Sequence, residues 1–182
     1  MGRATRVFAA VFGSLAALAG IEHGVGELLQ GGVRPAGLVI ESWPDSAFFR
    51  IQSGEPALTL VPDLLAAGVL TIAVSLVLLV WSVAYVQRRH GGLVLIGLSF
   101  VLLLVGGGFG PPLLGTLVGL TAVAGGAPTR GRRAGAAQRL MPGHARVLAA
   151  LWPWALAACL AAWLFLLPGV PMLSYFWGVE SA

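Results

Sequence analysis

The sequence predicts an all-α integral membrane bundle with five transmembrane helices, or four if the N-terminal segment is removed as a signal peptide. Of the 182 residues, 58% are hydrophobic and only 10% are charged, and the mean hydropathy is +0.90. Soluble domains carry about a quarter charged residues, so a soluble fold of this composition would lack polar surface. Apolar stretches of about the length of a membrane span also alternate with short arginine clusters. We therefore expect residues 1–182 to form a single membrane domain.

The individual spans follow from the length of the apolar stretches, since a spanning helix needs about 20 mostly apolar residues. The expected spans are Val7–Leu29, Leu64–Val86, Leu93–Gly107, Pro112–Gly125 and Arg146–Leu167. The third and fourth are short, and we expect them to tilt little or to meet a thinned bilayer. The first has a basic start and a possible cleavage site at Ala17-Leu18-Ala19. Its helical pattern continues past Gly20, which favours retention over cleavage.

The arginines set the expected orientation, because cytoplasmic loops of membrane proteins are rich in basic residues. An inside N-terminus and an outside C-terminus in the cytoplasmic membrane would leave nine of the eleven on the cytoplasmic side: Arg3, Arg6, Arg88, Arg89, Arg130, Arg132, Arg133, Arg139 and Arg146. The formal charge of +4 then reflects topology, and nucleic acid is not an expected partner. Residues 126–145 read as a cytoplasmic basic linker in contact with membrane lipids.

Residues 31–62 are expected to form an extracytoplasmic loop with a short helix lying at the membrane interface. Ser42 or Trp43 would cap this helix, Pro44 would occupy its first position, and Gly54 would end it. Trp43 would anchor it at the interface. The alternative for this loop is a lid over a substrate site, because long loops often carry function.

The stretch GIEHGVGELLQGG, residues 20–32, places ionisable groups at the outer end of the first span. At 100° per residue, His23, Glu27 and Gln30 share one helix face with the small residues Gly13, Ala16, Gly20 and Gly24. Small residues at such spacing let a neighbouring helix approach closely, so this is the expected packing face. Glu22 lies on a different face among leucines, where it must either reach water or meet protein.

Three alternatives remain open for Glu22, His23 and Glu27. They could form a hydrogen-bonded polar cluster that ties the helices together. They could form a proton or cation site, since His23 and Glu27 stand one helical turn apart. The third alternative is a metal site with His23 and Glu27 as ligands, but His90 and His144 lie on the expected cytoplasmic side, so no second histidine is available. That separation also argues against haem, and no cofactor is expected.

A second informative stretch, VGGGFGPPLLG, covers residues 105–115 at the expected outer turn between the third and fourth spans. It reads either as a tight helical hairpin or as backbone that lines a ligand cavity. Both special stretches fall on the outer side, which predicts one outward-facing site. Its candidate binding residues are Glu22, His23, Glu27, Gln30, Gly107, Gly108 and Phe109.

The stretches GIEHGVGELLQG and HGGLVLIGLSFVLLLVGGGFGPP resemble those of a set of uncharacterised small multi-pass membrane proteins of bacteria and archaea. The resemblance covers most of residues 20–125 and implies membrane residence, without an activity to carry over. The leading hypothesis is binding or transport of a small solute or cation. The alternative is a non-catalytic accessory or assembly subunit whose small-residue faces dock on partner helices or on a second copy. No hydrolytic, phosphate-binding or dinucleotide-binding motif supports an enzyme.

Overall fold

The computed structural model describes residues 2–49, 54–126, 154 and 161. The chain divides into two compact units, Met1–Gly126 and Ala127–Ala182. The first unit contains, in order, α1 (Arg3–Gln30), β1 (Val39–Glu41), β2 (Pro56–Leu58), α2 (Leu64–Val80), the π-helical turn η2 (Trp81–Tyr85), α3 (Gly91–Val105) and α4 (Gly110–Gly126). Of the second unit the structure describes only Trp154 and Ala161, both helical.

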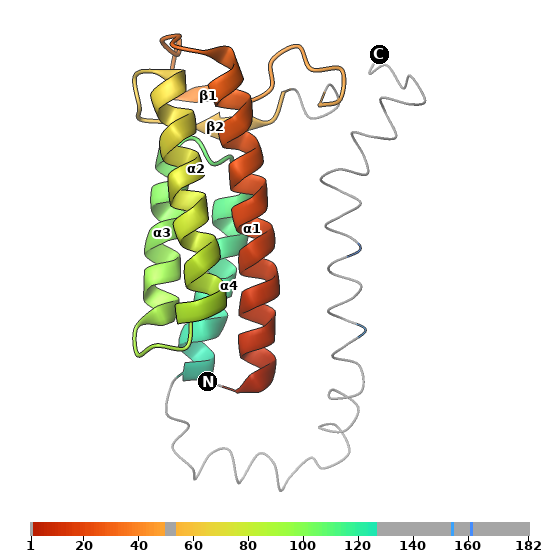
Figure 1. Ribbon diagram of the computed structural model, residues 1–182, viewed down its shortest axis with the longest axis vertical. Coiled ribbons are helices and arrows are strands. Elements are labelled where there is room, and N and C mark those ends of the chain that lie inside the picture. Colours follow the sequence, from red (N-terminus) through yellow and green to blue (C-terminus); the bar gives the residue numbers. More distant parts are fainter. Residues whose placement is uncertain (1, 50–53, 127–153, 155–160, 162–182) are drawn as a thin grey trace, which may run out of the picture. The chain divides into compact units, whose positions relative to one another are not determined.

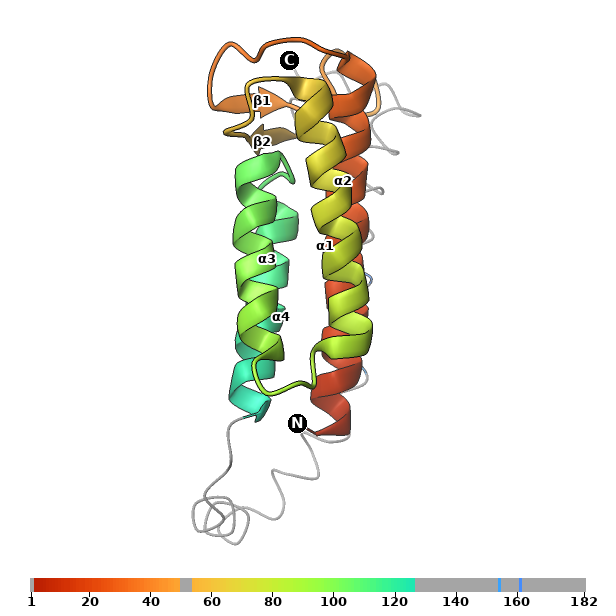
Figure 2. The same ribbon diagram turned by 60° about the vertical axis from the view of Figure 1, so that its left-hand side comes forward.

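The four helices of the first unit form an up-and-down bundle (Figure 1). Helices α1 and α2 pack along their lengths, as do α3 and α4, and α1 also packs on α4 (Figure 2). The N-terminus of α1, the turn between α2 and α3, and the end of α4 lie at one end of the bundle, and β1 and β2 lie at the other. Among the described basic residues, Arg3, Arg6, Arg88 and Arg89 belong to the first of these ends.

Small residues allow α1 and α2 to approach closely, as the sequence predicted. A methyl group on Gly13 would collide with Ser82, one on Gly20 with Ser75, and one on Gly24 with the backbone of Gly68. The expected packing face of α1 is buried along most of its length. Leu18 and Leu29, on other faces, are exposed. The same contact buries polar side chains of α2 and η2, namely Thr71 and Ser75 on α2 and Ser82 on η2.

A small antiparallel sheet caps the end of the bundle opposite the N-terminus. β1 pairs with β2 in the register Val39 to Leu58, Ile40 to Ala57 and Glu41 to Pro56. The pairing continues into the loop, where the backbone N–H of Ser42 donates to the Glu55 carbonyl over 3.2 Å and that of Trp43 to the Gly54 carbonyl over 2.8 Å. Beyond β2, Leu60 N–H donates to the Leu104 carbonyl over 2.8 Å, so the sheet is fastened to α3.

The expected interfacial helix is not formed over residues 44–49, which make turns and bends, and residues 50–53 lie outside the described residues. The strand pairing supplies the reason, because Ser42 and Trp43 are held in extended pairing and cannot cap a helix. Asp45 then takes a φ of 58°, a left-handed conformation that a right-handed helix excludes.

Among the residues that the structure describes, two helical segments are long and apolar enough to cross a membrane, Arg3–Gln30 and Leu64–Tyr85. α3 and α4 are apolar but shorter, at 15 and 17 residues. Helices therefore stand at the first four positions at which the sequence predicted spans. The fifth expected span, Arg146–Leu167, falls almost entirely outside the described residues, as does the basic linker of residues 126–145 beyond Gly126.

Candidate functional site

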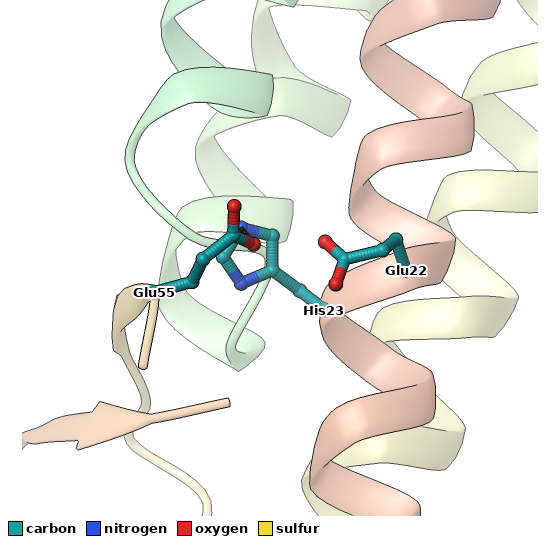
Figure 3. A group of neighbouring side chains, drawn as sticks. All are labelled: Glu22, His23 and Glu55. Atoms are coloured by element: carbon teal, nitrogen blue, oxygen red, sulfur yellow. Dashed lines mark ion pairs between the residues drawn. The ribbon is translucent and has the colours of Figure 1, made fainter. Parts of the chain in front are cut away.

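Three side chains of types that can bind a metal meet between α1 and the loop that joins β1 to β2. Glu22 and His23 come from α1, and Glu55 precedes β2 (Figure 3). One ligand atom from each lies within 4.8 Å of the other two. Glu22 is half-buried, and His23 and Glu55 are 4% and 5% exposed. Glu22 thus meets protein on the face that looked lipid-facing in the sequence. We call Glu22, His23 and Glu55 the carboxylate–histidine cluster.

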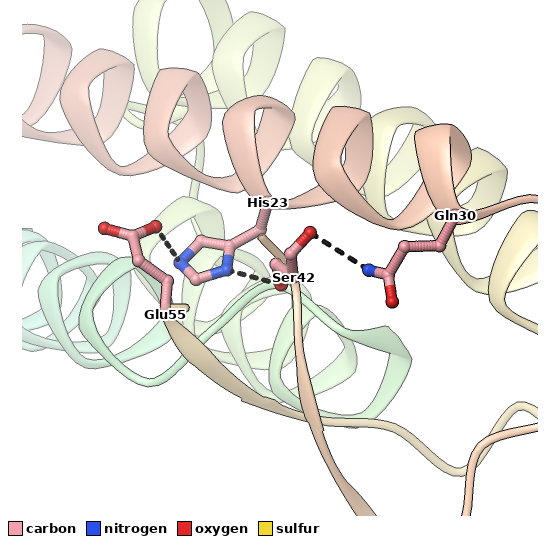
Figure 4. Close-up of polar contacts among 4 residues, drawn as sticks. All are labelled: His23, Gln30, Ser42 and Glu55. Atoms are coloured by element: carbon pink, nitrogen blue, oxygen red, sulfur yellow. Dashed lines mark hydrogen bonds and ion pairs between the residues drawn. The ribbon is translucent and has the colours of Figure 1, made fainter. Parts of the chain in front are cut away.

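Both nitrogens of the His23 imidazole lie close to polar side chains (Figure 4). Its Nδ1 lies 2.9 Å from the Ser42 hydroxyl oxygen. Its Nε2 lies 3.3 Å from Glu55 Oε2, within the distance of an ion pair. Glu55 Oε2 nevertheless has no hydrogen-bond partner of acceptable geometry among the described residues. Ser42 therefore orients the ring and leaves Nε2 to face the Glu55 carboxylate.

Glu55 reaches this position through an unusual backbone conformation. Its φ is 55°, and the preceding Gly54 has a φ of 74°. Non-glycine residues with such angles are uncommon and are concentrated at functional sites. Burial raises the pKa of the Glu55 carboxyl, and a hydrogen bond with the Glu22 carboxyl offsets part of that rise. Two carboxyl groups can hydrogen-bond to each other only if one of them carries a proton. For both to be ionised, the cluster therefore needs a bound positive charge.

Glu27 lies close to the cluster but in separate surroundings. Its side chain is fully buried, and Oε2 accepts a hydrogen bond from the Thr71 hydroxyl over 3.3 Å. The same hydroxyl lies 2.9 Å from the Val105 carbonyl oxygen, so its single hydrogen is shared between two acceptors. Glu27 Oε1 has no partner among the described residues. His23 and Glu27, which the sequence offered as joint metal ligands, do not belong to the same set of converging ligand atoms.

The glycine turn between α3 and α4 packs directly against these acidic and imidazole side chains. Gly106 has a φ of 122°, and a Cβ there would collide with the carboxylate of Glu27. Gly108 has a φ of 71°, and a Cβ there would collide with the His23 ring at Nε2. The two special stretches of the sequence therefore meet in space. Gly107 packs on Leu102 instead, and Phe109 is 47% exposed.

Gln30 fastens the sheet to the end of α1 and lies outside the cluster. Its side-chain amide N–H donates to the Glu41 carbonyl over 2.9 Å. It also donates to the Ser42 carbonyl over 3.0 Å (Figure 4). It also lies 3.2 Å from the Gly26 carbonyl oxygen. These bonds place Ser42 beside His23, so Gln30 acts on the cluster through the backbone of the loop.

Sequence reasoning missed Ser42 and Glu55 as neighbours of His23. Glu55 is one of several acids in residues 31–62, and no periodic pattern in that loop distinguishes it. Its position between Gly54 and Pro56 was the available signal, since both neighbours constrain the backbone.

A surface hollow of about 510 Å³ lies at the opposite end of the bundle, where Trp81, Arg88, Arg89, His90, Gly91 and Val94 line it. Its charged side chains are basic, and Arg88 stacks on Tyr85 at 4.9 Å from the ring centroid. No residue of the carboxylate–histidine cluster lines this hollow, so the cluster remains the candidate site.

No protein-family model, curated protein or solved structure matches the chain.

Proposed function

We propose that this chain is a five-span protein of the cytoplasmic membrane, with its N-terminus inside and its C-terminus outside. In this proposal it serves as a binding or transport protein for a small cation, which it holds at an outward-facing polar site beneath the sheet.

The exposed apolar side chains support residence in a membrane. Large hydrophobic residues are exposed along all four helices of the first unit, including Leu18 and Leu29 on α1, Val69 and Val77 on α2, Leu93 and Phe100 on α3, and Leu113 and Leu120 on α4. Monomeric soluble proteins rarely expose so much contiguous apolar surface. Hydrocarbon around the bundle removes the cost of exposing these side chains to water. The arginine-rich end of a membrane bundle is the end expected in the cytosol.

Unpaired carboxylate oxygens carry the proposal of cation binding. Glu22 Oε1, Glu27 Oε1 and Glu55 Oε2 are buried without a hydrogen-bond partner in the part of the chain that the structure describes. A buried acceptor without a partner costs on the order of 1–3 kcal/mol, and more if it is charged. A bound cation satisfies such oxygens directly, and the acids lie at the end of the bundle opposite the basic turn.

The accessory-subunit hypothesis loses the sequence argument that favoured it. A carboxylate such as Glu22 on an otherwise lipid-like face favours a partner helix from another subunit, but the loop between β1 and β2 supplies a partner within the chain, since Glu22 lies next to Trp43 and Glu55. We therefore retain cation binding as the single proposal.

The proposed topology is testable by labelling single cysteines in sealed, right-side-out vesicles. After Cys159→Ala, we expect a membrane-impermeant thiol reagent to label Ser46→Cys in the loop and Ser181→Cys near the C-terminus, but not Arg132→Cys. Permeabilising the vesicles should then expose Arg132→Cys. Labelling of Arg132→Cys in sealed vesicles would reverse the proposed orientation, and protection of Ser181→Cys would reduce the number of spans.

Cation binding is testable with the full chain in lipid nanodiscs. We expect at least one member of a panel of Na⁺, K⁺, Mg²⁺, Ca²⁺ and Zn²⁺ to bind saturably at constant ionic strength, as measured by calorimetry. His23→Ala should weaken that binding at least about tenfold, because the cation would lose the His23 nitrogen as a ligand and only the two carboxylates would remain to hold it. His90→Ala is the matched control, since His90 is exposed at the other end of the bundle. If no cation of the panel binds, the proposed function is wrong.

A further inference from the structure

We infer that Glu22, His23 and Glu55 bind a divalent transition-metal ion, with Zn²⁺ as the best-matched probe. This inference rests on the proposed cation binding and names the class of ion.

The spacing of the ligand atoms fits a small tetrahedral ion. With zinc–ligand bonds of about 2.0–2.2 Å, two ligands on one tetrahedral ion stand about 3.4 Å apart. His23 Nε2 and Glu55 Oε2 are already 3.3 Å apart and make no hydrogen bond of acceptable geometry. The most distant pair in the cluster is within 4.8 Å, so an adjustment of at most about 1.4 Å brings the Glu22 carboxylate to the same ion.

The orientation of His23 matches that of a metal-binding histidine. Such histidines usually donate the N–H of the nitrogen that does not bind the metal to a neighbouring acceptor, which fixes the tautomer and aims the lone pair. Here Nδ1 contacts Ser42 at 2.9 Å, so Nε2 is left to bind. A neutral Nε2 that faces a carboxylate oxygen is repelled by it, and a cation between the two atoms turns that repulsion into two bonds.

Unsatisfied polar atoms give an independent reason to place an ion here. Glu55 is 5% exposed, and its Oε2, which lies on the His23 side, has no hydrogen-bond partner among the described residues. Glu22 Oε1 is likewise buried and unpaired. In native proteins the large majority of buried side-chain polar atoms have a hydrogen-bond partner, so each buried atom without one needs an explanation. A bound ion supplies the missing partner for both oxygens.

The donor set selects the class of ion. Na⁺, Mg²⁺ and Ca²⁺ prefer an all-oxygen shell of six or more ligands, which one imidazole and two carboxylates do not supply. Imidazole with carboxylates suits Zn²⁺ and its neighbours among the transition metals. Three protein ligands also leave one tetrahedral position open for water or another exchangeable ligand, as in zinc sites that act on a bound molecule.

The experiment uses the full chain in nanodiscs, purified without a polyhistidine tag, and titrates Zn²⁺ alone by calorimetry. We expect one saturable Zn²⁺ site per chain, and Co²⁺ should give the intense visible absorption of a tetrahedral complex. Glu55→Gln is nearly isosteric and should weaken Zn²⁺ binding by more than the 10–100-fold typical of changes outside the ligand shell. Glu41→Gln, an exposed acid of the same sheet, is the matched control and should bind as the wild type does.

The outcomes separate this inference from the proposed function. Saturable binding of Na⁺ or K⁺ that depends on His23, without a Zn²⁺ site, overturns the inference and leaves the proposed function standing. Zn²⁺ binding of equal affinity in the wild type, His23→Ala and Glu55→Gln overturns it as well. If His23→Ala fails to fold, Glu55→Gln and the Co²⁺ spectrum of the wild type still decide.

Discussion

Gly106→Ala is expected to lower the free energy of unfolding by about 2–6 kcal/mol, a large part of the stability of a domain. Two effects add. The φ of 122° is poorly accessible to alanine, and such backbone strain costs about 1–3 kcal/mol. The new Cβ would also collide with the Glu27 carboxylate, and overpacking of a core costs about 1–3 kcal/mol. Reversible unfolding in mild detergent measures the difference.

Two further variants separate these effects. Gly31 also has a positive φ, of 77°, but nothing lies within 4 Å of a Cβ placed there, so Gly31→Ala reports the backbone strain alone. Glu27→Ala in the Gly106→Ala background removes the colliding carboxylate and should restore part of the lost stability. If Gly31→Ala and Gly106→Ala were equally destabilising, and Glu27→Ala restored no stability, then the glycine turn would not pack tightly against Glu27.

Gly108→Ala is expected to weaken Zn²⁺ binding about 10–100-fold, the range seen when a group that orients a ligand is changed. The reason is local, because the added Cβ would collide with His23 at Nε2, the nitrogen proposed to hold the ion. The ring would have to turn away and lose its contact with Ser42. Calorimetric titration with Zn²⁺ in nanodiscs gives the affinity.

Gly110→Ala serves as the control for this variant, because Gly110, the first residue of α4, directly follows the same turn and nothing lies within 4 Å of the position that its added methyl group would take. The melting temperature without metal shows whether Gly108→Ala remains folded. A folded Gly108→Ala that binds Zn²⁺ as tightly as the wild type would contradict the proposed role of His23 Nε2.

The helices of the first unit could be predicted from sequence because their signals are local. Apolar stretches and their ends lie within about 20 residues, and the spacing of small residues fixes which face of α1 packs. The structure confirms that face, with Gly13, Gly20 and Gly24 set against α2. The meeting of the two special stretches was also expected, from the side of the membrane on which both were placed.

The loop between α1 and α2 was the part that local signals described wrongly. Ser42, Trp43 and Pro44 are typical of a helix start. In the structure, however, Ser42 and Trp43 continue the strand pairing, with Glu55 and Gly54 as their partners. Strand pairing depends on residues distant in the sequence, and nothing within residues 42–44 specifies that partner.

The sequence by itself determined a helical, strongly apolar protein, and it predicted that most basic residues lie toward one end and the acidic residues toward the other. It also singled out His23, Glu27 and the glycine turn as special. Only the tertiary structure decided that His23 is grouped with Glu22 and Glu55, while Glu27 turns to Thr71. The physical reason is that hydropathy and helical periodicity act between near neighbours along the chain. The choice of Glu55 depends instead on a contact between residues 32 positions apart, made by a loop that lacks periodicity.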